Sequence, residues 1–64
     1  MKRWIKRIDS SGEAPDIDLF LADLKEICIK HNMSISHEDS WGAFIIHSFC
    51  DANLRWLEEA LDGR

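Results

Sequence analysis

The sequence predicts a small α+β domain in which an antiparallel β-hairpin lies between two helices, in the order helix, hairpin, helix (αββα). Apolar residues recur at helical spacing over residues 16–31, and again from residue 51 to about residue 61. Between these segments, residues 33–49 change to strand-like alternation around a polar turn that contains Gly42. A chain of 64 residues is one domain. It buries only about 60% of the surface of its unfolded form, so dimerisation, a metal ion or a disulfide is the usual supplement to its stability.

The N-terminal residues 1–15 are expected to form a basic arm and a loop, and residues 16–62 the folded core. Apolar residues alternate with basic ones at the start of the chain, a pattern that fits either a short extra strand or a loosely packed arm. Residues 9–16 collect turn-forming side chains and the single proline, which favours a loop leading into the first helix.

The first helix is predicted over residues 16–31. Its apolar stripe consists of Ile17, Phe20, Leu21, Leu24, Ile27, Cys28 and His31. Leu19 and Ile29 lie outside this stripe, which widens the apolar surface and indicates a second contact. Asn32 should end the helix, because asparagine tolerates the left-handed conformation that commonly follows the last turn.

The hairpin turn is expected at residues 38–42. We expect Asp39 or Ser40 to bond backbone amides there, Glu38 to be solvated, and Gly42 to take a positive φ. The loop from His37 to Ser40 contains a histidine, two carboxylates and a hydroxyl, which are the groups used in acid and base chemistry. Turn formation is the commoner use of these residues.

The second strand of the hairpin, residues 43–46, is almost continuously apolar. Such a run is expected of a strand covered on both faces. We therefore expect Phe44 and Ile46 to point into the core.

The second helix is predicted to begin at Asp51, as its N-cap, and to end near Leu61. Its apolar side chains form one stripe of leucines and a second, neighbouring pair made by Trp56 and Ala60. Two strands alone are only marginally stable. Both helices should therefore cover one face of the sheet, and a second copy of the chain should cover the other, giving a homodimer with Trp56 at or near the contact.

Charge is distributed unevenly along the chain. Half of the eight basic residues lie within the first seven positions, whereas all twelve acidic residues lie in the rest. The basic residues of the arm are Lys2, Arg3, Lys6 and Arg7. An acidic body repels phosphate backbones, so nucleic-acid binding is not expected of the domain as a whole, although the arm could reach a phosphate. No signal peptide or membrane-spanning stretch is recognisable, which predicts a cytoplasmic location with free thiols.

The candidate metal ligands are Cys28 and His31 near the end of the first helix and His47 and Cys50 after the hairpin. The hairpin could bring both pairs together around a tetrahedral zinc ion. Against zinc, the order of the ligands is not a usual one, and Cys28 lies within an apolar stripe where a thiol packs as a small hydrophobe. We therefore predict that the thiols pack as small apolar groups, and that the chain binds no metal and no other cofactor.

Tryptophans give the clearest candidates for an interaction surface. Trp41 lies beside the turn, where it either folds back over the sheet or is presented to a partner, and tryptophan is enriched at binding hot spots. Trp56 fits the core or a dimer contact, and the surplus apolar residues Leu19 and Ile29 complete the predicted interaction set. No P-loop, dinucleotide fingerprint or nucleophile elbow is present, so the chain is not expected to be an enzyme.

A longer pattern combines residues 31–40, residues 42–46 and the set Asp51, Asn53, Trp56 and Leu57. It resembles small uncharacterised accessory proteins of tailed phages and prophages of enteric bacteria, over about residues 21–61. The resemblance implies a phage protein that acts in the host cytoplasm; it brings no catalytic residues. The favoured function is thus a non-enzymatic module that binds a host protein. The alternatives are a nucleic-acid-associated regulator that uses the basic arm, and a zinc-stabilised adaptor.

Overall fold

The computed structural model describes residues 1–38 and 40–64, which form two β-hairpins and two α-helices. In chain order they are β1 (Lys2–Ile5), the 3-10 turn η1 (Lys6–Ile8), β2 (Ser10–Glu13), α1 (Pro15–His31), β3 (Met33–His37), β4 (Phe44–Ser48) and α2 (Asp51–Glu58). The α+β class is confirmed. The order helix, hairpin, helix is incomplete, because a first hairpin, β1–β2, precedes α1.

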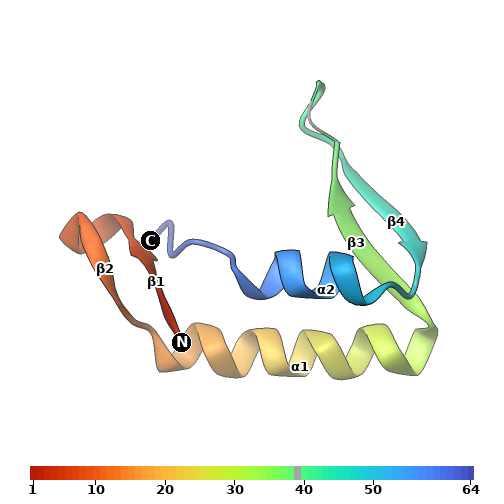
Figure 1. Cartoon of the computed structure of the whole chain (residues 1–64), viewed down its shortest axis with the longest axis horizontal. Coiled ribbons are helices and arrows are strands. Elements are labelled where there is room, and N and C mark those ends of the chain that lie inside the picture. Colours follow the sequence, from red (N-terminus) through yellow and green to blue (C-terminus); the bar gives the residue numbers. More distant parts are fainter. Residues whose placement is uncertain (39) are drawn as a thin grey trace.

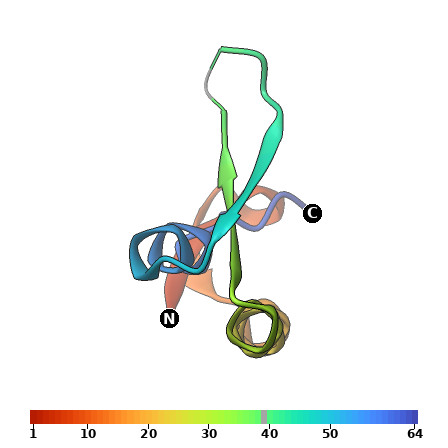
Figure 2. The ribbon, with the colours of Figure 1, turned by 90° about the vertical axis from the view of Figure 1, so that its right-hand side faces the viewer.

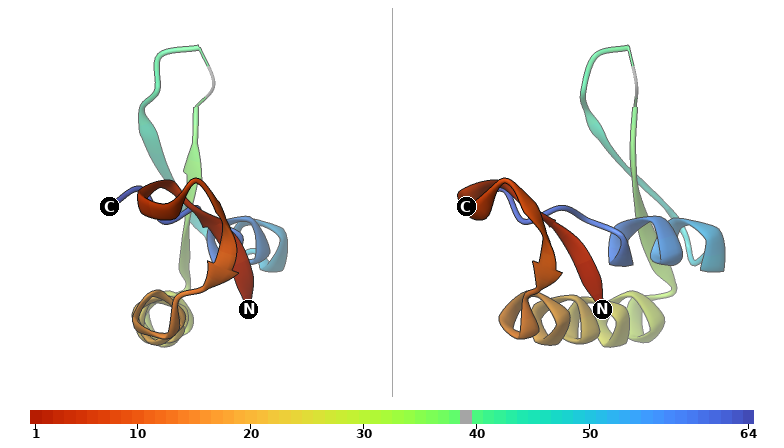
Figure 3. Two further views of the ribbon diagram at one scale, coloured as in Figure 1. Left: turned by 90° about the vertical axis from the view of Figure 1, so that its left-hand side faces the viewer. Right: turned by 60° about the vertical axis from the view of Figure 1, so that its left-hand side comes forward.

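The two helices lie one above the other, and a hairpin stands at each end of them (Figure 1). The β3–β4 hairpin starts where α1 ends and rises past α2, so that its outer part projects away from both helices (Figures 1 and 2). At the opposite end, the C-terminal segment returns to lie beside β1 (Figure 3). The projecting hairpin is the feature that positions the candidate site.

The N-terminal residues form an antiparallel hairpin in which Lys2 lies opposite Glu13 and Ile5 opposite Ser10. The C-terminal segment adds a parallel bridge between Ile5 and Asp62. In this bridge the Asp62 N–H donates to the Trp4 carbonyl at 2.9 Å, and the Lys6 N–H donates to the Asp62 carbonyl at 2.9 Å. The start of the chain therefore forms a strand, which was one of the two forms expected for it.

Arg3 joins three elements from a buried position. Its Nη1 donates to the backbone carbonyls of Glu58, the last residue of α2, at 3.2 Å and of Ala60, two residues beyond the helix, at 2.7 Å. Its Nη2 donates to the carboxylate of Asp18 on α1. Because the last carbonyls of a helix have no partner within the helix, Arg3 acts as a side-chain cap for α2 and ties it to α1.

Helix α1 begins one residue before the predicted boundary and ends where it was expected. Asn32 adopts φ 53° and ψ 44°, and its N–H donates back to the last turn, so the predicted left-handed cap is confirmed. Helix α2 differs more from the prediction. Its N-cap is Cys50 rather than Asp51, and it ends at Glu58, three residues before Leu61, because Arg3 and the bridge to β1 use the backbone that follows.

The β3–β4 ladder divides the hairpin into two faces. Paired residues share a face, so Ile35 and Ile46 lie together with His37 and Phe44, whose rings meet edge to face at 5.6 Å. The other face carries Ser34, which is buried against α2, where its hydroxyl accepts a hydrogen bond from Asn53 Nδ2 at 3.1 Å.

The prediction that the second strand is covered on both faces is wrong for the single chain. Every residue of β4 is exposed. Phe44 is 77% exposed and Ile46 61%, so neither points into the core. The reason is that α2 packs beside β3 and against its serine face, while the apolar face of the projecting hairpin extends beyond the helices.

Candidate functional site

The tip of the β3–β4 hairpin is the most exposed part of the chain that carries a large aromatic side chain. Trp41 is 89% exposed there, against 42% for Trp4 and 53% for Trp56. Residue 41 was expected either to fold back over the sheet or to be presented to a partner. The structure places its side chain in water.

Glu38 holds the backbone that carries this tryptophan. Its carboxylate accepts hydrogen bonds from the backbone N–H of Ser40, at 2.8 Å, and of Trp41. The carboxylate of Glu38, which the sequence predicts to be solvated, thus supplies turn contacts of the kind expected of Ser40 or Asp39. Asp39 itself lies outside the described residues.

Two backbone hydrogen bonds close the same turn. The Glu38 N–H donates to the Ala43 carbonyl at 2.7 Å, and the Gly42 N–H donates to the Glu38 carbonyl at 3.0 Å. Gly42 has φ +71°, as predicted, a conformation that side chains other than glycine rarely adopt. Glu38 is thus bonded to Ser40 and Trp41 through its side chain and to Gly42 and Ala43 through its backbone.

These contacts also shift the ionisation of Glu38. The N–H donors of Ser40 and then Trp41 hold the pKa of the Glu38 carboxyl below its ordinary value of 4.5. A hydrogen bond to a carboxylate stabilises the charged form. At neutral pH the carboxylate is therefore ionised and occupied by backbone donors, which leaves it poorly suited to accept a proton from a substrate.

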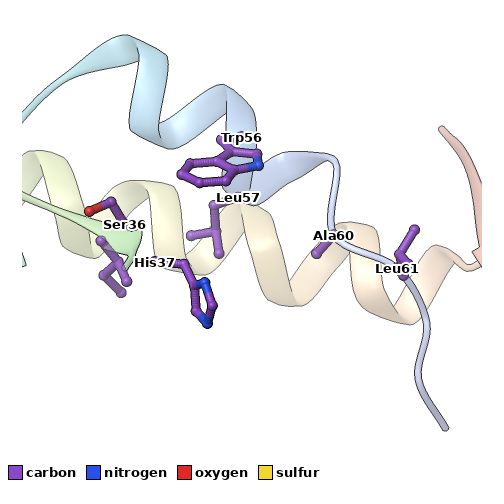
Figure 4. Close-up of a pocket in the computed structure, with 7 residues that line it drawn as sticks. Ser36, His37, Trp56, Leu57, Ala60 and Leu61 are labelled. Atoms are coloured by element: carbon purple, nitrogen blue, oxygen red, sulfur yellow. The ribbon is translucent and has the colours of Figure 1, made fainter. Parts of the chain in front are cut away.

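Below the tip, an apolar groove runs between the hairpin and the helices. Its first cavity, of about 540 Å³, is lined by β3 and by the end of α2, with Trp56, Leu57, Ala60 and Leu61 on one side and Ser36 and His37 on the other (Figure 4). A second cavity of about 480 Å³ shares Leu57, Ala60 and Leu61. Most of its other lining residues belong to the first half of α1 and include Phe20. We call these adjoining cavities the helix–hairpin groove.

The predicted interaction residues do not share one surface. Trp56 lines the groove, whereas Ile29 lies at a shallow depression between α1 and α2. Leu19 is exposed on α1. Trp41 lies apart from all three at the tip, so the structure divides the set into a tip, a groove and outer positions on α1.

The four candidate zinc ligands are not gathered into a site. Among residues 1–38 and 40–64, no group of three or more His, Cys, Asp or Glu side chains lies close enough to hold a metal ion. Cys28 is buried in α1 and Cys50 is exposed at the start of α2. His47 Nε2 is hydrogen-bonded to the hydroxyl of Ser36 at 2.7 Å.

The basic N-terminal residues are separated by the fold. Arg3 is buried and engaged, and Arg7 lies 3.9 Å from the carboxylate of Asp62. Lys2 and Lys6 are exposed. Of the four basic side chains, Arg3 is therefore the one that the fold takes out of solvent.

Sequence reasoning missed the role of Glu38 and the groove residues of α1. A carboxylate two and three residues before the amides of a turn is a recognisable signal for side-chain capping, and it was available at Glu38. The exposure of Phe20 could not be predicted from the sequence, because its spacing places it in the same apolar stripe as the buried Leu21.

No helix in the described part of the chain is long and apolar enough to cross a membrane. Comparisons with models of protein families, with curated proteins and with solved structures find no match.

Proposed function

We propose that this chain is a non-enzymatic accessory protein of the phage type, which binds a host protein in the cytoplasm through the tip of the β3–β4 hairpin. The observation that carries the proposal is Trp41, whose side chain is 89% exposed and whose backbone N–H donates to the Glu38 carboxylate. The resemblance of residues 21–61 to phage accessory proteins supports the setting.

The energetic reason is that an exposed tryptophan is costly unless a partner covers it. Burying about 200 Å² of aromatic surface is worth about 5 kcal/mol before the costs of association. The hydrogen bond from the Trp41 N–H to the Glu38 carboxylate restrains the backbone of Trp41 before binding, and such preorganisation improves affinity. An exposed aromatic side chain at the end of a projecting hairpin therefore has the character of a binding hot spot.

The charged groups of the chain support an interaction role over the alternatives. Glu38 is occupied by backbone donors and Arg3 by carbonyls and Asp18, so both serve the fold. The net charge of −4 disfavours contact with a phosphate backbone. A partner protein recognised by an apolar side chain fits this distribution.

The test is site-specific photo-crosslinking in enteric host cells. A benzophenone amino acid replaces Trp41 in one variant and Trp4 in a matched control, since Trp4 lies on β1 at the other end of the molecule. We expect position 41 to crosslink to one host protein and position 4 not to do so. The proposal is wrong if both positions give the same crosslinked products.

The captured protein is then purified and titrated with the unmodified chain. We expect Trp41→Ala to raise the dissociation constant by about 30-fold or more, as is typical of a hot-spot residue. Ile8→Ala removes an exposed apolar side chain from η1, at the other end of the fold, and should leave the affinity unchanged.

A further inference from the structure

The single chain exposes more surface than a compact monomer of its mass. Its accessible surface is 4950 Å², whereas a folded monomer of 7.4 kDa is expected to expose about 4,200 Å². Its radius of gyration is 12.6 Å, against about 11 Å for a compact domain of 64 residues. The excess of about 700 Å² indicates that a surface suited to burial is open.

The outer part of the β3–β4 hairpin projects away from both helices (Figures 1 and 2). Every residue of β4 is exposed, and Phe44 and Ile46 lie on the same face of the sheet as Ile35 and His37. Ile35 and His37 also line the helix–hairpin groove. The apolar face of the hairpin is therefore continuous with the groove.

The outer edge of β4 lacks the usual protection against pairing. In the described part of the chain, β4 pairs only with β3, in a two-stranded sheet. Its sequence, Phe-Ile-Ile-His-Ser, has no lysine, proline or carboxylate, the residues by which proteins commonly protect an exposed edge strand. An edge of this kind is suited to pairing with another strand.

We propose that a second copy of the chain occupies this surface. The two β4 strands lie side by side and antiparallel about a twofold axis centred on Ile46, the middle residue of the strand, and form a four-stranded sheet. In this arrangement the projecting part of each hairpin lies beside the base of the other. Because opposed residues of antiparallel strands share a face, the Phe44 and Ile46 side chains of both copies then lie on one side of this sheet and form one continuous apolar face.

The excess exposed surface of the chain is large enough for an interface with a second copy. A stable interface of standard size buries about 800 Å² on each partner, which is close to the excess of about 700 Å² that each chain exposes. A symmetric pair uses the same patch twice, so it closes without leaving a further edge of β4. The proposal does not depend on the host-binding role of the tip, because it uses β4 rather than Trp41.

Sedimentation velocity at high micromolar concentration tests the proposal. We expect the unmodified chain to sediment at twice its mass of 7.4 kDa. Ile46→Lys should weaken the dimer by at least 100-fold while leaving the circular dichroism spectrum unchanged, since Ile46 is exposed in the single chain. Ile8→Lys introduces the same charge at a similarly exposed isoleucine on η1 and should remain dimeric.

Disulfide trapping tests the register. In a Cys50→Ser background, Ile46→Cys should form an interchain disulfide under mild oxidation, because residues at the axis of antiparallel strands face each other within disulfide reach. Two results would overturn the proposal: a 7.4 kDa species at every concentration, or a dimer that survives Ile46→Lys. Trp41→Ala should stay dimeric, which separates failure of this proposal from failure of the tip as a binding site.

Discussion

Arg3→Ala should remove a third or more of the free energy of unfolding of this chain, although sequence alone places Arg3 in a solvated basic arm. The guanidinium is buried and donates to two carbonyls at the end of α2. Hydrogen bonds to charged groups contribute about 1.5 kcal/mol or more each, so losing both costs about 3 kcal/mol. A 64-residue domain has a free energy of unfolding of only about 3–10 kcal/mol.

Urea unfolding followed by circular dichroism measures this loss. With a slope of about 1 kcal/mol per molar urea for a small domain, the midpoint of Arg3→Ala should fall by about 3 M. Arg3→Lys should be intermediate, since an ammonium group keeps the charge but lacks the planar fork that reaches two carbonyls and a carboxylate. All variants are compared at one protein concentration, because dimerisation would contribute to the midpoint.

Lys2→Ala provides the matched control on the neighbouring residue. Lys2 is exposed, so its replacement should change the free energy of unfolding by less than about 0.5 kcal/mol. If Arg3→Ala unfolds at the same urea concentration as Lys2→Ala, Arg3 does not hold α2, and the N-terminal hairpin does not fasten the two helices together.

Three further outcomes are expected. Asn32→Gly should be neutral or stabilising in thermal unfolding, whereas Asn32→Ala should cost about 1 kcal/mol, because Asn32 has φ 53°; equal melting temperatures would contradict this. Iodoacetamide should modify exposed Cys50 in the native protein and buried Cys28 only after unfolding, as read by peptide mass spectrometry. Since the pKa of Glu38 is lowered by folding, its contribution to the tip is complete above pH 4.5 and is lost as the pH falls through the folded pKa. The protection factor of the Trp41 amide, which compares its exchange rate with that of an unstructured peptide at the same pH, should therefore fall as the pH falls below 4.5, and Glu38→Gln should abolish this change.

Elements with a local signal were predictable from the sequence. The period of α1 and the asparagine after it locate the helix, because both depend on residues within a few positions of one another. The β3–β4 hairpin follows from alternation around Gly42 for the same reason. The α+β class rests on these two elements, and it is confirmed.

Elements that depend on distant partners were not predictable. Strand β2 has the sequence Ser-Ser-Gly-Glu, which carries no apolar alternation, and it is a strand because its backbone pairs with β1. The burial of Arg3 requires the carbonyls of Glu58 and Ala60, more than fifty residues away. No local pattern distinguishes such an arginine from a solvated one.

The candidate site was predictable in part. Trp41 was identified as an interaction residue from its place beside a turn, and the exposure of its side chain agrees with presentation to a partner. The direction in which the hairpin points was not predictable, because it depends on α2 packing against the serine face of β3 rather than the face of Phe44.

The most direct test of the tip as the binding site is a ¹⁹F spectrum of the chain labelled with 5-fluorotryptophan, which gives one signal for each of its three tryptophans. In the free protein, the Trp41 signal should be the one most strongly broadened by a soluble paramagnetic agent. When the host protein captured through position 41 is added, the Trp41 signal should lose this sensitivity while the Trp4 signal keeps its own. A Trp41 signal that stays equally exposed in the complex would contradict binding through the tip.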